Sequence, residues 1–460
     1  MSESRGKFDL TTGSILQKLV MVAVPIMGTQ FMLMTYNLVD MFWLGRLGSG
    51  AVAAAGAAGM YMWLANGLMM MGRMGAEIGC SQNFGRGDME KALQFSQNAF
   101  ILSLSLGLFA MTTIIVFRIP LVRYFGIEDM SVASDAVEYL MLVALGMPFQ
   151  YTTGVISGTF NGSGNSRISF FGNSIGLLVN VIMDPLLIFT FNMGVAGAAL
   201  ATVFAQFSVM AFLAYSIKRG KTRPFTNYRF FRKPDFAVLR QIFKWSIPIS
   251  MESMFYAFLS MTVTKFIAEF GYQAMAASRI GGQIESLSWL IGGGYGSAVT
   301  AFVGQNYGAG KWKRIRDGYR SSLFAMVCWG AIVSLILYFG GKFIFMMFIA
   351  ENEVIEIGII YAQTIALAQI PANVAVVPSG TFKGIGQTIK PSIVTVSYNV
   401  LRVVLAYFLA RTSLGLTGIF YAYTITSVLG NTALFIWYFL SSRKHPKIDE
   451  STNPQVCGNI

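Results

Sequence analysis

Long apolar stretches recur along the whole chain and are separated by short polar connections. The first runs from Leu19 to Val39, 21 residues without a charged side chain. About 20 apolar residues are enough for a helix to cross the hydrocarbon core of a bilayer, and isolated strands cannot satisfy their backbone groups in lipid. The pattern therefore predicts an all-α polytopic membrane protein. The expected spans are 15–40, 51–80, 91–117, 133–158, 168–190, 195–217, 239–268, 274–304, 319–346, 355–381, 390–411 and 416–440.

Four motifs occur twice in the same order. VPIMGTQ at Val24 returns as IPISMES at Ile247, 223 positions later, and SGTFNGSGNS at Ser157 returns as SGTFKGIGQT at Ser379, 222 positions later. The pairs SQNFGRGDMEKA/GQNYGAGKWKRI and MGVAGA/LGLTGI are offset by 223 and 221 positions. These matches indicate a duplicated unit of six spans. Because six is even, both copies have the same orientation, and we expect a pseudo-twofold axis along the membrane normal.

The spans and the repeat predict five segments. They are a tail at 1–14, a first lobe of six spans at 15–217, a basic linker at 218–238, a second lobe of six spans at 239–440 and a tail at 441–460.

Composition agrees with this class of protein. Only 12% of the residues are charged, against about 25% in soluble domains. The net charge is +13, but the cations lie in short loops, so they do not predict a nucleic-acid partner. With the N-terminus inside, 23 Lys and Arg residues fall in inside segments and five in outside segments. Positive charge marks the cytoplasmic side, so we expect a cell-membrane protein with both termini in the cytoplasm.

The sequence argues against a disulfide scaffold, a metal centre and an ATP site. Cys80, Cys328 and Cys457 are widely scattered, and His445 is the only histidine. The Gly-rich GQNYGAGKW is not a phosphate-binding loop, because it has Gln where the first Gly is needed and Trp where Ser or Thr is needed. We interpret it as a tight turn, and we expect any transport to be driven by an ion gradient, with no cofactor.

Charged residues inside spans are functional candidates, because burial of a charge in a bilayer costs at least about 2.5–3.5 kcal/mol at a helix centre. For Arg73, Glu77, Lys265 and Arg279 we favour a simpler role as headgroup anchors near span ends. The stronger candidates are Asp40, Asp184, Glu252, Glu285 and Arg402.

Asp184 lies on a polar helix face. Asn173, Asn180 and Asp184 are spaced seven and four residues apart, which places them on one side of a helix. Pro185 follows and cannot donate a backbone hydrogen bond, so a carbonyl one turn back is freed. These groups could hold a proton or a small hard cation. The alternative is a polar stripe that only joins helices.

Asp40 follows the first charge-free run and has two interpretations. It either marks the end of the span at the headgroups or is a carboxylate inside the membrane. It shares a helix face with Tyr36 and Asn37 and, further back, Gln30. Pro25 gives the same helix a bend point. The polar face favours the inner position, where Asp40 would exchange a proton near neutral pH.

The two halves differ in their charges. Asp40 corresponds to Val263 and Asp184 to Ala406, so the acidic pair occurs only in the first half. Arg402 corresponds to Asn180. It would pair with Glu252 or Glu285, and the sequence does not decide which. If it is unpaired, it would favour an anionic group on a substrate.

These residues resemble a known family. The six-plus-six duplication, YNLVDMFWLGRLG in the first span, QNFGRGD after the second, GTFNGSGNSR after the fourth and NVIMDPLLIFTFNMGVAGAALAT across the fifth and sixth are similar to the multidrug and toxic compound extrusion (MATE) family. The resemblance covers about residues 10–440. The first-half acids suggest its DinF-like prokaryotic branch, because the second-half acid of the NorM-like branch aligns roughly with Tyr256.

The resemblance implies two six-helix bundles around a V-shaped cleft that opens alternately to either side. It implies export in exchange for H⁺ or Na⁺. The coupling-ion site carries onto Asp40, Asn180, Asp184 and Thr202. Bending of the first helix carries onto Pro25.

We therefore expect a monomeric secondary exporter, not an enzyme, that moves small amphipathic cations or zwitterions across the bilayer. Tyr36, Asn37, Gln30 and Asn173 would line its cavity, and Na⁺ would be its only metal. The first alternative is a flippase for lipids or lipid-linked oligosaccharides, motivated by Arg402. A channel or a non-transporting receptor agrees less well with the duplication and the intramembrane acids.

Overall fold

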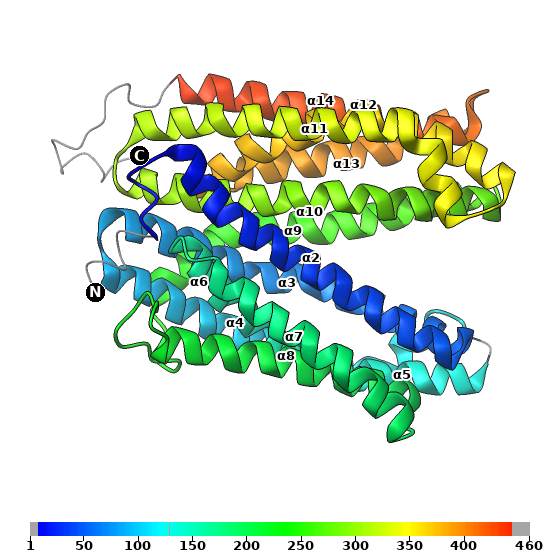
Figure 1. The fold of residues 1–460 in the computed structure, drawn as a ribbon, viewed down its shortest axis with the longest axis horizontal. Coiled ribbons are helices and arrows are strands. Elements are labelled where there is room, and N and C mark those ends of the chain that lie inside the picture. The colour runs from blue at the N-terminus through cyan, green and yellow to red at the C-terminus, as the bar shows by residue number, and fades with distance from the viewer. Residues whose placement is uncertain (1–7, 128, 444–460) are drawn as a thin grey trace. The chain divides into compact units, whose positions relative to one another are not determined.

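The computed structural model describes residues 8–127 and 129–443. Within these ranges all regular secondary structure is helical, with no strand (Figure 1). Each of the twelve expected spans corresponds to one long helix or to a helix broken once. The predicted all-α fold is confirmed. The outer parts of both predicted tails, with His445 and Cys457, lie outside the described residues.

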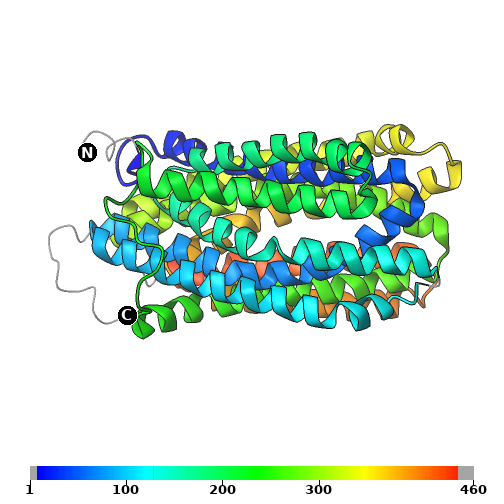
Figure 2. The ribbon, with the colours of Figure 1, turned by 90° about the horizontal axis from the view of Figure 1, so that it is seen from below.

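Within each half of the chain, the long helices run lengthwise beside one another in both side views (Figures 1 and 2). The helices of the first half are α2 (Ile15–Leu47), α3 (Ser49–Arg86), α4 (Met89–Arg123), α5 (Met130–Ala144), α6 (Met147–Gly162), α7 (Arg167–Pro185), the π-helix η1 (Leu186–Thr190) and α8 (Gly194–Arg219). The helices of the second half are α9 (Phe236–Ala268), α10 (Tyr272–Gly308), α11 (Trp312–Phe348), α12 (Asn352–Gly384), α13 (Ile389–Leu409) and α14 (Gly415–Ser442).

Two predicted spans are interrupted by proline. The span predicted at 133–158 consists of α5 and α6, which meet at 42°. Pro148 explains the break, because its ring would clash with the carbonyl of Ala144, where α5 ends. The fifth span changes from α-helix to π-helix directly after Pro185. Both breaks lie in the half that carries the two acids.

Eight helices of the described chain are long and apolar enough to cross a membrane, and the bent α5–α6 pair adds a ninth. The other three, α3, α9 and α10, have 38, 33 and 37 residues. A helix of 33 residues is about 50 Å long, against a hydrocarbon core of about 30 Å. Their length therefore suffices to cross the core.

The chain forms two compact units. The first contains Met21–Ser250 with the N-terminal residues up to Leu10, and the second contains Thr11–Val20 with the residues from Met251 onward. Helices α2 and α9 each contribute to both units. Within the first unit α3 and α4 pack on α6, and α7 packs on α8. Within the second, the matching helices α10 and α11 pack on α12, and α13 packs on α14.

The duplication appears again in close contacts between helix backbones in each unit. A Cβ atom added at Gly158 would lie 2.6 Å from the carbonyl oxygen of Arg73, and one added at Gly380 would lie 2.7 Å from that of Gly296. One turn further on, Gly162 makes the same kind of contact with the Glu77 carbonyl, at 2.7 Å. Small residues four apart let membrane helices approach closely. The two units therefore use the same glycine spacing at equivalent positions.

The predicted turn after the second span of each unit is also present. Gly87 and Gly310, 223 positions apart, have φ of +78° and +70°, in the left-handed region that glycine adopts without strain. GQNYGAGKW accordingly contains the end of α10, a short turn and the start of α11. At the first of these turns Asp88 caps α4 by accepting a hydrogen bond of 3.0 Å from the backbone N–H of Lys91. This hydrogen bond lowers the pKa of Asp88.

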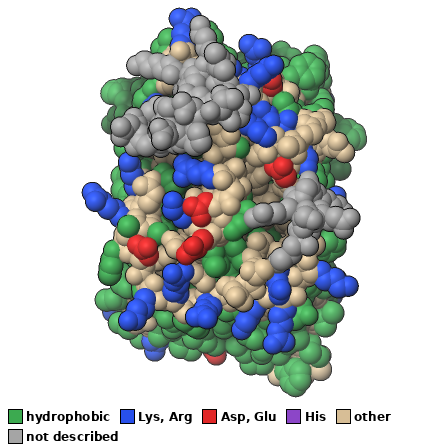
Figure 3. Space-filling view, turned by 90° about the vertical axis from the view of Figure 1, so that its left-hand side faces the viewer, with side chains coloured by type: hydrophobic (Ala, Val, Ile, Leu, Met, Phe, Trp, Pro, Cys, Tyr) green, Lys and Arg blue, Asp and Glu red, His purple; other side chains and the backbone are tan. Residues whose placement is uncertain are grey.

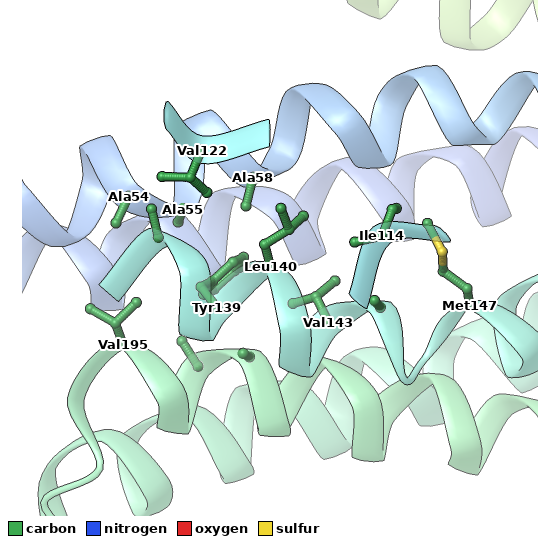
Figure 4. Close-up of a cluster of buried hydrophobic side chains, with 14 of the residues drawn as sticks. Ala54, Ala55, Ala58, Ile114, Val122, Tyr139, Leu140, Val143, Met147 and Val195 are labelled. Atoms are coloured by element: carbon green, nitrogen blue, oxygen red, sulfur yellow. The ribbon is translucent and has the colours of Figure 1, made fainter. Parts of the chain in front are cut away.

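A hydrophobic core in the first unit surrounds α5 (Figure 4). Ala54, Ala55 and Ala58 of α3 lie on one side of α5, and Val195 of α8 lies on the other. The α5 residue Tyr139 is part of this cluster and is 7% exposed. Small residues on α3 thus let α5 pack closely, and this packing fixes the position of Tyr139.

Lys and Arg side chains are spread over the helix ends in Figure 3, where Asp and Glu are fewer. Positive charge at one end of the helices is the pattern expected of a cytoplasmic face. Which end faces the cytoplasm stays a prediction.

Candidate functional site

Asp40 lies inside a helix and not at its end. Helix α2 continues to Leu47, seven residues beyond the predicted end of the first span. The basic residue of the last turn is Arg46, whose guanidinium lies 4.7 Å from the Phe42 ring centroid and 5.3 Å from that of Trp43. Cations and aromatic rings of this kind are typical of a membrane interface. The end marker is therefore Arg46, and Asp40 lies nearly two turns deeper.

Asp184 is the penultimate residue of the α-helical part of its span. It is fully buried, as is Asn180, whose side-chain amide donates to Asp184 Oδ1 over 3.1 Å. Pro185 follows, and the chain continues as the π-helix η1. The four-residue spacing predicted a shared face for Asn180 and Asp184, and the structure places their side chains in contact. Single-turn π-helices are frequent at functional sites.

The structure brings the two acids together. They lie within electrostatic range of each other. Tyr139 donates a hydrogen bond of 3.4 Å to Asp40 Oδ2. The Tyr36 hydroxyl lies next to Thr202 and within electrostatic range of both carboxylates. Four elements of the first unit, α2, α5, α7 and α8, therefore converge on one polar cluster.

Several oxygen atoms of this cluster have no hydrogen-bond partner among the described residues. They belong to Tyr36 (hydroxyl), Asp40 (Oδ1), Asn180 (Oδ1), Asp184 (Oδ2) and Thr202 (Oγ1). A buried polar atom without a partner is costly and calls for an explanation. Carboxylate, amide and hydroxyl oxygens are the ligands that hard cations prefer. The donor set suits Na⁺, and its two carboxylates equally suit protons.

Three residues predicted to line the cavity are not joined to the acids. Asn37 is exposed, and Gln30 is half-buried. The Asn173 side chain donates to the Ser169 carbonyl in its own helix over 2.7 Å. Pro25 lies within a continuous α2, where Thr29 donates to its carbonyl over 3.0 Å. The polar stripe on α7 therefore divides into one end at Asn180 and Asp184, which belongs to the polar cluster, and another at Asn173, which bonds only to its own helix.

Tyr139 was missed by the sequence analysis. It is a single tyrosine in a helix with no other unusual feature, and no motif marks it. Only the packing of α5 against α3, α4 and α8 places its hydroxyl beside Asp40.

The prediction of a headgroup anchor is wrong for Glu77. This residue is fully buried in α3, beside the close contact with α6 at Gly162. Lys265 and Arg279 are exposed, and Arg73 is half-buried. The error arose because α3 extends to Arg86, six residues past the predicted end at 80, so that Glu77 lies well inside the helix.

In the second half, Arg402 forms an ion pair with neither candidate acid. Its Nε donates to Thr426 over 3.3 Å and its Nη2 to Ser427 over 3.1 Å. Glu252 accepts instead from Ser392 over 2.7 Å. Glu285 accepts from aromatic residues of α10, α12 and α14. Of the two alternatives that the sequence left open, the structure therefore shows the one without an ion pair, and the two carboxylates accept from hydroxyl and indole donors instead.

With this geometry established, comparison with known proteins decides the family. The model of the MatE family matches the chain twice, over residues 25–186 and 248–408. The chain belongs to the MATE family. The matched ranges begin 223 positions apart, which is the offset of the repeat.

Relatives of this MATE protein have similar lengths. A probable multidrug resistance protein NorM of Thermotoga maritima is 24% identical and covers 93% of this chain and 93% of its own. A multidrug export protein MepA of Staphylococcus aureus is 21% identical and covers 92% of this chain and 93% of its own. A crystal structure of MATE in the bent conformation has a TM-score of 0.89 at 22% identity, covering 95% of this chain and 97% of that chain.

These comparisons confirm the predicted family and fold. MATE proteins are membrane transporters, so this chain is a multi-pass membrane transporter and not an enzyme. Assignment to the DinF-like branch stays a prediction, as do the roles of the individual site residues.

Proposed function

We propose that this MATE protein is a secondary multidrug exporter that exchanges H⁺ or Na⁺ for substrate at Asp40 and Asp184. The cluster of buried oxygens around the two acids supports this proposal most directly. Relatives named as multidrug resistance and multidrug export proteins support the class of substrate. The expected substrates are small amphipathic cations or zwitterions, and the expected location is the cell membrane, with both termini in the cytoplasm.

Exchange at this cluster follows from its chemistry. Two carboxylates in a low-dielectric interior cannot both stay ionised without a compensating cation. A bound proton or Na⁺ would offset one of the two negative charges, and its release would leave a more negative site for a cationic substrate. Each cycle of the exporter would alternate these two states.

Pro25 connects ion binding at the site to the shape of α2. It lies in α2, the helix that carries Asp40. A proline inside a helix removes one backbone hydrogen bond and lowers the cost of bending there. Structures described as MATE in the bent and in the straight conformation support a change of shape in proteins of this fold. In this proposal, ion binding at Asp40 changes the bend at Pro25 as the protein alternates between its two open states.

The test uses purified protein in liposomes, with a pH gradient and a Na⁺ gradient imposed separately. Efflux of the cationic dye ethidium is measured for wild type, Asp40→Asn and Asp184→Asn. Glu138→Gln is the matched control, because Glu138 is an exposed acid next to Tyr139. Both Asn variants are expected to lose most gradient-driven efflux, while Glu138→Gln keeps the wild-type rate.

Wild-type efflux driven by only one gradient identifies the ion. Efflux by Asp40→Asn at the wild-type rate under either gradient would show that Asp40 does not couple transport. Translocation of a fluorescent lipid-linked oligosaccharide without any dye efflux would favour the flippase.

A further inference from the structure

The second unit contains a buried cation without a direct counter-ion. Arg402 is 7% exposed, and α14 holds it through the hydroxyls of Thr426 and Ser427. Its guanidinium lies 3.9 Å from the Tyr423 ring centroid and 5.5 Å from that of Tyr398. Within the described residues it forms no ion pair with a carboxylate, and its Nη1 makes no hydrogen bond.

One of the two candidate acids, Glu285, accepts three hydrogen bonds from aromatic side chains. Glu285 Oε1 accepts from Trp289 over 3.0 Å and from Tyr423 over 2.6 Å, and its Oε2 accepts from Tyr361 over 3.2 Å. Tyr423 therefore contacts the anion with its hydroxyl and the cation with its ring. Both charged groups therefore contact Tyr423, and they form no salt bridge with each other.

This cluster is not a second copy of the first-half site. Arg402 occupies the repeat position of Asn180, and Ala406 occupies that of Asp184. A cation replaces the amide that binds the acid, and the acid itself is absent. The second half therefore presents positive charge where the first presents negative charge.

The surroundings suit an aromatic ligand. Trp289 and Tyr256 are 43% and 37% exposed, and Tyr256 is within electrostatic range of both Glu285 and Arg402. The cluster therefore reaches the surface of the unit through aromatic side chains. Aromatic rings beside a carboxylate attract organic cations, and a guanidinium with free donors binds carboxylates strongly in a low dielectric.

We propose that this cluster is a substrate-recognition site for zwitterionic aromatic amphipaths, in which Arg402 binds the carboxylate and Glu285 with its aromatic neighbours receives the cationic part. The proposal rests on the transport function proposed above, because it names a substrate class for that transporter. It assigns opposite tasks to the two halves, with ion exchange in the first and substrate recognition in the second.

The test compares two probes that differ in one charge. Rhodamine B is a zwitterion at neutral pH, and its ethyl ester is a cation of nearly the same shape. Binding of each to purified wild type, Arg402→Gln and Arg402→Lys is measured by fluorescence polarisation. Arg402→Gln is expected to weaken rhodamine B binding about tenfold, as loss of one charge-assisted hydrogen bond predicts, and to leave the ester within about twofold. Arg402→Lys is expected to lie between the two.

Arg411→Gln is the matched control. Arg411 also stacks on a tyrosine, with its guanidinium 3.6 Å from the Tyr407 ring centroid, but it is exposed. Its replacement is expected to leave the binding of both probes unchanged. If Arg402→Gln does not fold, the wild-type protein alone tests the proposal. Its affinity for rhodamine B must then be about tenfold higher than its affinity for the ester.

Equal weakening of both probes by Arg402→Gln, or no weakening of either, would overturn the proposal. Competition by a polyprenyl phosphate would also overturn it if the lipid displaces rhodamine B at a concentration far below the Kd of rhodamine B. Such a result would assign the site to lipid phosphates. Asp40→Asn separates the two proposals, because it should abolish gradient-driven efflux and leave the ratio of probe affinities intact.

Discussion

Substitution of Gly158 by alanine tests the packing that holds α3 against α6. The added Cβ would lie 2.6 Å from the Arg73 carbonyl oxygen, and 3.4 Å from the Arg73 carbonyl carbon. Cβ atoms essentially never approach other atoms within 3.0 Å, so α6 must withdraw by at least about 0.4 Å. The obstacle is backbone of another helix and not the end of a flexible side chain. The neighbouring contact of Gly162 with the Glu77 carbonyl would be loosened by the same movement.

The two opposing effects can be estimated. Overpacking of a well-packed interior costs about 1–3 kcal/mol. Replacing glycine by alanine inside a helix returns about 0.5–1 kcal/mol. Gly158→Ala is therefore expected to destabilise the protein by about 0.5–2 kcal/mol. Gly380→Ala in the second unit, where the added Cβ would lie 2.7 Å from the Gly296 carbonyl oxygen, is expected to do the same.

The assay measures the apparent melting temperature in detergent. The readout is the amount of monodisperse protein that remains after heating. Gly59→Ala is the matched control, because Gly59 lies in α3 and a Cβ there meets nothing within 4 Å. The control should melt at or above the wild-type temperature, and Gly158→Ala a few degrees below it. A Gly158→Ala protein as stable as Gly59→Ala would refute the argument that these helices depend on a bare backbone contact.

Three further predictions concern polar contacts. Tyr139→Phe removes the donor to Asp40 and is expected to slow gradient-driven dye efflux by roughly two- to tenfold; an unchanged rate in liposomes would show that the contact is not used. Asp88→Ala removes the cap of α4 and is expected to cost about 0.5–2 kcal/mol. Because the pKa of Asp88 is lower in the folded protein, the stabilisation from ionised Asp88 is present above about pH 4 and is lost as the pH falls through the folded value; a difference in melting temperature between wild type and variant that does not shrink as the pH is lowered from about 4 would contradict this. Lys311→Ala removes hydrogen bonds of 2.9 and 3.2 Å to the carbonyl and hydroxyl of Thr11, and faster hydrogen exchange around Thr11 is expected; protection equal to wild type would count against it.

Sequence periodicity was sufficient for the helices but not for their ends. The apolar runs locate twelve segments because a bilayer demands about 20 apolar residues from each helix. They do not show where a helix stops once it leaves the hydrocarbon, since polar residues continue helices equally well. This is why α2 passes Asp40 by seven residues and why Glu77 proved to be buried.

The candidate acids were predictable because charge is rare in spans, whereas their partners were not. Asn180 and Asp184 lie four residues apart on one helix, so their contact follows from helical geometry alone. Tyr139 lies on a different helix, 99 residues from Asp40 along the chain. No local sequence pattern predicts this contact. It depends on the close packing of α5 against α3, which the small alanine side chains of α3 allow.

The sequence by itself determined the class of protein, the duplication and the first-half location of the acids. The tertiary structure decided which polar groups share a site. It placed Asp40 within electrostatic range of Asp184, and it placed Tyr423 between Arg402 and Glu285, where the sequence left a salt bridge open. The physical reason is that charge and hydropathy are properties of single positions, whereas a hydrogen bond requires two groups to meet within about 3 Å, and packing between helices sets that distance.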